Sequence, residues 1–192
     1  VEFANKHQVP LRVLSSFEEG PGTLITTAVS ADESPLVSGI ALDRDQAKLT
    51  LVGVPHQNNV SDVLNALSEN NIEVDVMVQN MAAPQDKVDF SFTVHLDDFQ
   101  QAFDISKSIS QKLGVSEVTG NKRIAKLSIV GLGMKTHASV AAKMMQTLGD
   151  EGISIHLITS SEVKISTVID EKYIELGARI LHTAFALGRA SE

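Results

Sequence analysis

Two carboxylates on an alternating segment are the side chains of this sequence best suited to binding chemistry. From residue 72 to residue 79 apolar and polar side chains alternate, and Glu73, Asp75 and Gln79 fall on the polar side. Such alternation is typical of a strand with one face on a core. Glu73 and Asp75 could there hold an ammonium group. The spacing leaves a second interpretation open, in which both are solvated side chains on an edge strand.

Two loops offer the complementary chemistry. Residues 54–60 and 132–140 each lead from a predicted strand into a predicted helix, so each presents free N–H groups at a helix start. Groups of this kind bind a carboxylate well. A carboxylate pocket beside an ammonium partner suits the zwitterion of a free amino acid, and that is the ligand class we predict.

Other kinds of site lack the residue spacing that they need. Gly131-Leu132-Gly133 has neither the third glycine nor the following Lys-Ser/Thr of nucleotide loops. The six histidines form no H-x-x-x-H pair, and the chain has no cysteine, which argues against a metal site. Ser160-Ser161-Glu162 lacks the glycines of a nucleophile elbow. We therefore expect no catalytic site and no metal site in this chain.

The composition excludes two classes of partner. The formal net charge is −8 and no cluster of Lys and Arg stands out, which argues against a nucleic-acid surface. No run of about 18 apolar residues occurs, so we expect no membrane partner. The absence of cysteine fits a reducing cytosol, and we predict a cytoplasmic protein.

The elements that must position these residues occur twice along the chain. Lys48–Val54 returns as Lys126–Leu132, and Ile72–Gln79 is answered by Ile153–Ser160. Helix-spaced apolar residues follow the first strand of both copies. The complete order in the first copy is strand, helix, strand, strand, helix, strand. This order predicts an α+β fold of two tandem ferredoxin-like modules.

The residues that follow the second helix of the second copy are too few to form its fourth strand. The unassigned strand-like residues 23–42 must then supply that strand, and the polar residues 43–46 predict a hairpin turn after it. We therefore expect two interlocked domains, residues 47–120 and residues 121–192. Residues 1–22 are interpreted as the end of a larger domain and its linker.

The second strand of each module is expected at a sheet edge. An apolar edge needs a partner, because its unpaired N–H and C=O groups would otherwise recruit other chains. Residues 72–79 and 153–160 should therefore pair with each other, or a second chain should cover them. The second arrangement predicts a homodimer.

Several separated motifs carry a family resemblance. They are Val37–Ala41, Lys48–Val54, Ile72–Asn80, Gly131–Lys135 and Ile158–Ser166. Together they resemble the regulatory region of bacterial aspartokinase (aspartate kinase), which is a tandem pair of ACT domains, and the likeness runs from about residue 9 to residue 187. The glycine-rich nucleotide motif of that family is absent, so the chain is similar to a β-subunit-like regulatory fragment.

The resemblance implies a function and a set of partners. Aspartokinase ACT domains bind L-threonine, L-lysine or both at ACT–ACT interfaces, and the bound effector inhibits aspartate phosphorylation in lysine, threonine and methionine biosynthesis. The expected partners are the effector, a second copy of the chain, and an aspartokinase catalytic domain or alpha subunit. ATP and Mg²⁺ are expected only for that catalytic domain, so this chain should hold no cofactor.

The family's effector contacts map onto particular positions of this sequence. From the first module they would come from the helix start and from strand two. From the second they would come from the corresponding elements and from the turn after strand two. These positions are Ser61, Glu73, Val74, Asp75, Gln79, Val140, Ala141, Ser154, Ile155, Ser161 and Glu162.

Two loops depart from the family pattern. The family usually has Asp-x-Pro-Gly before the first helix, where this chain has His56-Gln57-Asn58-Asn59, and Ala138-Ser139 replaces the usual Pro-Gly in the second module. The identity of the effector is therefore left open. These departures also support an alternative, in which the modules are a dimerisation scaffold for the kinase domain and sense no ligand.

Overall fold

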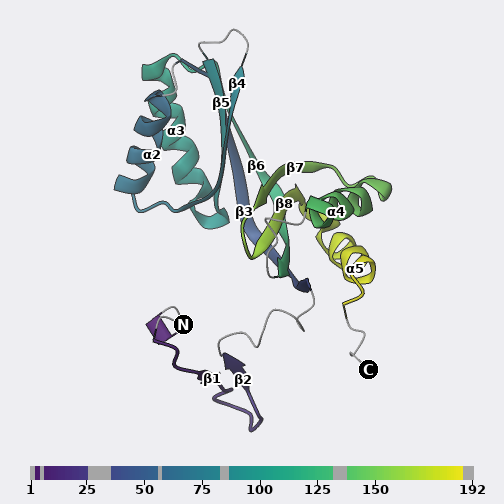
Figure 1. Cartoon of the computed structure of the whole chain (residues 1–192). Coiled ribbons are helices and arrows are strands. Elements are labelled where there is room, and N and C mark those ends of the chain that lie inside the picture. The colour runs from purple at the N-terminus through teal and green to yellow at the C-terminus, as the bar shows by residue number, and fades with distance from the viewer. Residues whose placement is uncertain are drawn as a thin grey trace. The chain divides into compact units, whose positions relative to one another are not determined.

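The computed structural model describes residues 3–4, 7–25, 36–55, 58–82, 87–131 and 138–187, with only the backbone of Asn58 and Ala82. The chain divides into two compact units, residues 1–35 and residues 36–192. Figure 1 labels the elements of both units, and each unit is described by itself.

The first unit contains a short hairpin. Strand β1 (Leu11–Val13) pairs antiparallel with β2 (Thr23–Ile25), and the Arg12 side chain donates a 3.0 Å hydrogen bond to the Pro21 carbonyl. Gly22 has φ +63°, a conformation that glycine adopts without steric cost. The prediction that residues 23–42 complete the second module is therefore wrong for 23–25, because this local hairpin gives them a partner. Residues 26–35 lie outside the described residues.

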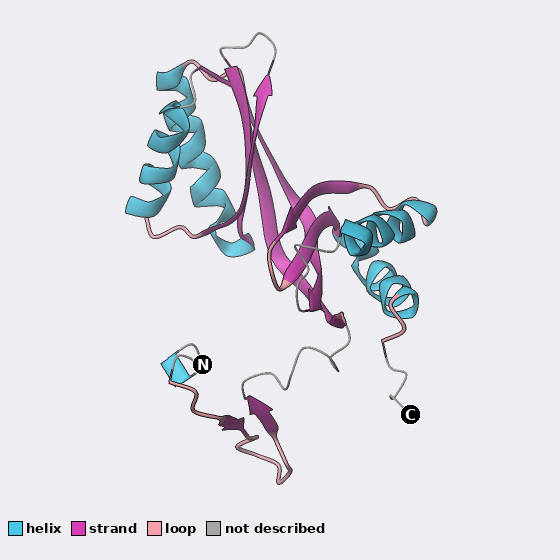
Figure 2. Cartoon of the chain, in the orientation of Figure 1, coloured by secondary structure: helices cyan, strands magenta, loops and turns pink. Residues whose placement is uncertain are grey.

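The second unit is built on one antiparallel sheet, whose strands are magenta in Figure 2. It has six strands in the order β4-β5-β3-β6-β8-β7. Helices α2 and α3 belong to the first half of the sheet, and α4 and α5 to the second half. Short 3-10 turns, η1 and η3, precede α3 and α5. The bounds are β3 (Val37–Pro55), α2 (Asn58–Glu69), β4 (Val74–Ala82), β5 (Lys87–His95), η1 (Leu96–Asp98), α3 (Phe99–Leu113), β6 (Glu117–Gly131), α4 (Ala138–Asp150), β7 (Ile155–Ser160), β8 (Lys164–Asp170), η3 (Glu171–Tyr173) and α5 (Ile174–Ala184).

Two long central strands each serve both modules. The later part of β3 pairs with β5, while its earlier part pairs with the later part of β6, as Ile40 does with Ile129. Residues 37–43 thus complete the second module, which confirms the interlocked arrangement for this part of the segment. Because β3 and β6 each run through both halves of the sheet, the two modules share their central strands.

The predicted hairpin turn at residues 43–46 is wrong. β3 continues through Asp43–Gln46, and shifts in its register with β6 absorb the irregularity there. Strand β6 is likewise continuous from Glu117 to Gly131, across the boundary expected between residues 47–120 and residues 121–192. Both strands stay extended because partners on their flanks satisfy the backbone groups, which a turn would have left unpaired.

Each module has its own helix-covered core. The periodic apolar residues of α2 and α4 face the sheet, as the sequence spacing predicts. The first core contains Leu49, Leu51, Val63, Leu67, Phe90 and Phe92, and the second contains Leu127, Ile129, Met144, Leu148, Ile165 and Ile169.

A smaller buried set lies on the other face of the sheet. Val76, Ile124 and Val168 are buried but belong to neither helix-covered core. Since side chains alternate along a strand, Ile124 faces away from the helices that its neighbour Ala125 packs against. Lys126 lies on the same face of β6 as Ile124. The cross-strand partner of Lys126 on β8 is Val168. This cover explains how a lysine side chain in the middle of β6 comes to be largely buried.

Candidate functional site

Strands β4 and β7 form the two edges of the sheet. Each has one neighbour, β5 for β4 and β8 for β7, which confirms the edge position predicted for strand two of each module. The two edges do not pair with each other within the chain, so that alternative is wrong. The physical reason is that the shared strands β3 and β6 join the modules at the centre of the sheet, which places β4 and β7 at its opposite ends.

Both edge strands are irregular at equivalent positions. The register of β4 shifts between Val74 and Met77, and that of β7 shifts between Ile155 and Leu157. Asp75 lies within the first irregularity. His156, 81 residues later and at the equivalent place in the repeat, lies within the second. Such irregularities re-aim side chains and are common beside functional sites.

Asp75 already holds an ammonium group, that of Lys126. The Lys126 Nζ donates to Asp75 Oδ2 and lies 3.3 Å from Asp43 Oδ2. The Lys126 side chain is 13% exposed, against 42% for Asp75 and 36% for Asp43. Burial lowers the pKa of Lys126, but the hydrogen bonds and charges of Asp75 and Asp43 outweigh that effect and raise it above 10.5.

The equivalent position of the second module has the opposite polarity. His156 Nε2 and Asp170 Oδ1 share a 2.8 Å hydrogen bond. The pKa of Asp170 is lowered, first by this bond, against a smaller opposing effect of burial, and further by the charges of His156, Lys172 and Arg123. The two modules therefore present different chemistry at matching places.

The His156–Asp170 pair predicts a pH dependence of stability. Because the pKa of Asp170 is lowered on folding from 3.8, its stabilising contribution is complete above about pH 4 and is lost as the pH falls further. His156→Ala should thus lower the urea midpoint of unfolding at pH 5, with the difference from wild type shrinking at pH 3. A difference that is equal at both pH values would contradict this account.

The predicted residues of the first module gather along β4 and α2. Asp75 and Gln79 are exposed on β4, Glu73 is exposed just before it, and Val74 packs on the first core. Among the described residues Glu73 makes no ion pair, so it does not join Asp75 in holding Lys126. Ser61 is exposed in the first turns of α2 and has an interaction partner.

The predicted residues of the second module lie on other elements. Val140 is 4% exposed and belongs to the second core, so only its backbone could meet a ligand. Ala141 and Ile155 pack against that core, while Ser154 is exposed. Strands β4 and β7, which carry candidates of the first and the second module, lie at opposite edges of the sheet.

The turn between β7 and β8 holds the remaining candidates. The Ser161 N–H donates to the Lys164 carbonyl at 2.8 Å, and Ser161 Oγ accepts from the Lys164 N–H at 3.2 Å, while Glu162 is exposed. Ser161 thus closes this turn. Residues 56–57 and 132–137 of the two helix-start loops lie outside the described residues, and His56 and Gln57 are therefore the family departures of which the structure says nothing.

Sequence reasoning missed Lys126, Asp43 and the His156–Asp170 pair. One signal was present in the sequence, because the repeat offset that defines the modules aligns His156 with Asp75. No signal pointed to Lys126, which lies 51 residues from Asp75 and on a different module.

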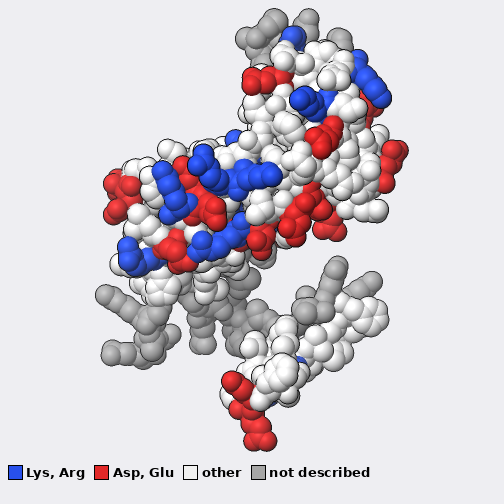
Figure 3. Space-filling model, turned by 180° about the vertical axis from the view of Figure 1, so that it is seen from behind, with Lys and Arg blue, Asp and Glu red and all other residues white. Residues whose placement is uncertain are grey.

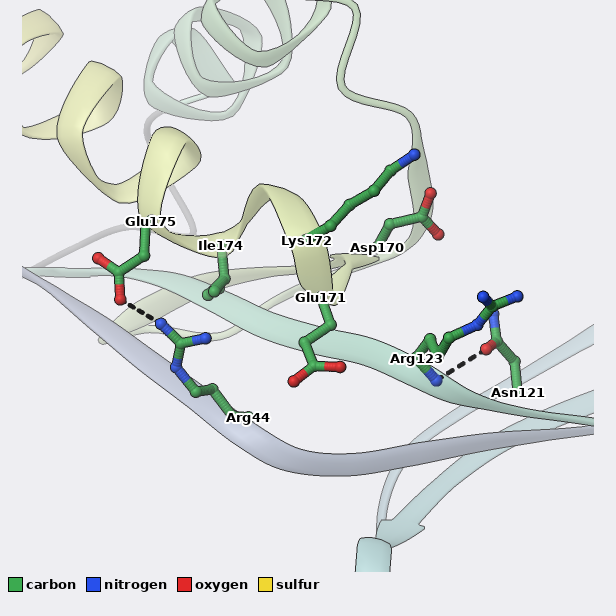
Figure 4. Close-up of a pocket in the computed structure, with 8 residues that line it drawn as sticks. All are labelled: Arg44, Asn121, Arg123, Asp170, Glu171, Lys172, Ile174 and Glu175. Carbon is green, nitrogen blue, oxygen red and sulfur yellow. Dashed lines mark hydrogen bonds and ion pairs between the residues drawn. The ribbon is translucent and has the colours of Figure 1, made fainter.

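A cavity of about 420 Å³ opens where η3 and the start of α5 meet β3 and β6 (Figure 4). Arg44 forms an ion pair with Glu175 across it, and the Asn121 side chain accepts a 2.9 Å hydrogen bond from the Arg123 N–H. The positive and negative charges of the side chains that line the cavity balance, so the cavity favours neither an anion nor a cation. The lining residues are Arg44, Asn121, Arg123, Asp170, Glu171, Lys172, Ile174 and Glu175.

The surface charge is mixed in sign. On the face shown in Figure 3, Lys and Arg side chains are interspersed with Asp and Glu side chains. Within the described residues, no helix is long and apolar enough to cross a membrane, and no three His, Asp or Glu side chains gather as a metal ion would need.

Comparison with known proteins decides the family. A model of the ACT domain matches residues 127–185. A solved structure of aspartokinase alpha and beta subunits is 43% identical with a TM-score of 0.73, and the match covers 79% of this chain and 99% of that chain. The chain belongs to the aspartokinase family. The ligand-free regulatory subunit of aspartate kinase from Thermus thermophilus is 37% identical, also with a TM-score of 0.73, over 78% of this chain and 99% of that one.

This chain corresponds to the regulatory part of aspartokinases, a tandem pair of ACT domains. The aspartokinase of Pseudomonas aeruginosa is 51% identical over 190 residues, which are 97% of this chain and 46% of that protein. The chain therefore spans about half the length of the curated aspartokinases that it matches. The family resemblance and the fold inferred from the sequence are both confirmed.

Proposed function

We propose that this chain is an amino-acid sensor that regulates an aspartokinase catalytic domain. L-Lysine, L-threonine or both would bind at an interface between ACT domains and inhibit aspartate phosphorylation in the biosynthesis of lysine, threonine and methionine. The observation that carries the proposal is Asp75. It is a partly exposed carboxylate in an irregular stretch of an edge strand, and it binds an ammonium group there.

The β4 edge suits a ligand held between two copies of the chain. Asp75, Met77, Gln79 and Met81 are all exposed along β4, and Met81 is 72% exposed. Unpaired strand groups and exposed apolar side chains together favour pairing with another chain. In the homodimer that we propose, Asp75 binds the effector's ammonium group, and Gln79 lies further along the same strand.

Other aspartokinases supply support for the ligand class and for the catalytic partner. Escherichia coli aspartokinase III in complex with lysine and aspartate shares this fold with a TM-score of 0.70, at 21% identity over 95% of this chain. Alpha and beta subunits occur together in a solved aspartokinase structure. We therefore propose an aspartokinase catalytic domain or alpha subunit as the partner, in the cytoplasm, with ATP and Mg²⁺ bound there.

The first unit belongs, in this proposal, to the catalytic side of the assembly. The solved regulatory subunits cover slightly less than four fifths of this chain, close to the share that residues 36–192 represent. The hairpin of residues 11–25 exposes Val13, Leu14 and Phe17, and Phe17 is 96% exposed. Apolar side chains exposed in such a small unit are best explained by contact with a further domain.

Regulation would work through a difference in affinity between two arrangements. An effector inhibits only if it binds the inhibited arrangement of the ACT dimer more tightly than the active one. Coupling free energies of allosteric proteins are typically about 1–3 kcal/mol, which corresponds to roughly a 5- to 150-fold effect.

A scaffold that senses no ligand is the second candidate function. One observation favours it, because Lys126 of the same chain neutralises Asp75. In that case the ACT domains would only dimerise and position the catalytic domain.

Calorimetry with L-lysine and L-threonine separates the two functions. The sensor predicts saturable binding of at least one amino acid, with D-alanine as a negative control, and light scattering should find a dimer at micromolar concentration. A folded dimer that binds neither amino acid would establish the scaffold in place of the sensor. A folded monomer would contradict the proposed edge pairing.

A further inference from the structure

The Lys126 ion pair joins three strands and both modules. Asp75 comes from the edge strand β4 of the first module, Lys126 from the part of β6 that belongs to the second, and Asp43 from the part of β3 that completes the second. One ammonium group is thus shared by two carboxylates, of which only Asp75 lies at the sheet edge.

The two carboxylates are held very differently. Asp43 is the cross-strand partner of Lys126, accepts a 3.1 Å hydrogen bond from the Asp45 N–H and accepts a 3.0 Å bond from the Gln46 side chain. Asp75, among the described residues, has Lys126 as its only side-chain partner. Asp43 is therefore a fixed acceptor for Lys126, whereas Asp75 is free to exchange its partner.

Solvent reaches the carboxylates more readily than the ammonium. Asp75 is about three times as exposed as the Lys126 side chain, by fraction of its surface. A small molecule can therefore approach Asp75 without first moving Lys126. If Lys126 then leaves Asp75, it keeps Asp43 and is not left as an unpaired buried charge, which would be costly.

We infer that Lys126 is an internal competitor for the effector: it occupies Asp75 in the free chain, and an amino acid's ammonium group binds by displacing it onto Asp43 alone. This inference rests on the proposed function and adds a mechanism to it. Effector binding then breaks a bond between the β4 edge and the second module, so occupancy at the edge is transmitted to the rest of the sheet.

The repeat contains a matched residue without this role. Lys48 occupies in the first module the place that Lys126 occupies in the second, 78 residues later. Among the described residues Lys48 forms no ion pair, and its cross-strand partners are Thr93 and Asn121. The position equivalent to Asp75 is His156, so the arrangement occurs in one module only.

The test is calorimetry with L-lysine and L-threonine on the full chain and three variants. Lys126→Met should bind the effector roughly fivefold or more tightly than wild type, because a competing ion pair is removed. Lys126→Arg, which keeps the charge, and Lys48→Met, the matched control, should bind as wild type does. Circular dichroism checks that each variant is folded.

The outcomes separate this inference from the proposed function. If wild type binds an amino acid and folded Lys126→Met binds it equally or less tightly, the competitor role is overturned while the sensor stands. If neither wild type nor Lys126→Met binds either amino acid, the sensor and the competitor role both fall.

A second measurement is made on the wild-type chain, so it remains decisive if Lys126→Met does not fold. In nitrogen-15 spectra of lysine side chains, the Lys126 Nζ signal is assigned by its loss in Lys126→Arg. Saturating effector should shift this signal and leave that of Lys48 in place. An unmoved Lys126 signal at saturation would overturn the exchange.

Discussion

Asp75→Asn is expected to weaken effector binding at least about tenfold. The substitution keeps the size of the side chain and removes its charge, so a charge-assisted hydrogen bond to the effector's ammonium group, worth roughly 1.5–3 kcal/mol, is lost. Folding should change little, because Asp75 is 42% exposed and Lys126 retains Asp43. Calorimetry with L-lysine and L-threonine measures the change.

Glu73→Gln is the matched control for this prediction. Glu73 lies two residues away, is exposed, and takes part in no ion pair among the described residues. Its loss of charge should change the affinity by less than about threefold, since exposed charges at a distance are screened. An affinity that is unchanged in Asp75→Asn would remove Asp75 from the binding site.

Leu148→Ala should destabilise both ACT domains by about 2–5 kcal/mol, the usual cost of this truncation at a fully buried site. Leu148 has no exposed surface in the second core. Because β3 and β6 run through both modules, neither half of the sheet can unfold without breaking strands of the other. We therefore expect one cooperative transition, shifted as a whole.

Urea unfolding followed by circular dichroism measures the shift, and amide hydrogen exchange reports on each module separately. Met145→Ala is the control, since Met145 is exposed on the same helix and its truncation should cost less than about 0.5 kcal/mol. Protection that persists in the first module, at Leu49 or Phe92, while the second exchanges would contradict the shared-strand account.

Much of the fold could be predicted from local residue patterns and from comparing the number of strands in the two modules. Apolar spacing indicated α2 and α4, alternation indicated β4 and β7, and the copied segments indicated two modules. The short tail after the second module implied that its last strand comes from earlier in the chain, and residues 37–43 do supply it. These features depend on neighbours in sequence or on chain length, so the sequence carries them directly.

The errors arose where the local pattern and the tertiary pairing disagree. Polar residues 43–46 have the composition of a turn, yet partners on the flanks of β3 keep them extended. Residues 23–25 have the composition of a strand for the second module, yet the nearby β1 pairs with them first. Composition cannot tell which partner will satisfy a backbone group.

The sequence by itself determined two copied ACT modules, their helix-covered cores, the edge position of β4 and the exposed carboxylate of Asp75. Only the tertiary structure decided that Lys126 reaches Asp75, because the two residues lie 51 positions apart on non-adjacent strands. Their meeting depends on how the shared strands cross from one module into the other. A side-chain pair of that kind is set by the packing of whole elements, and no residue pattern along the chain encodes it locally.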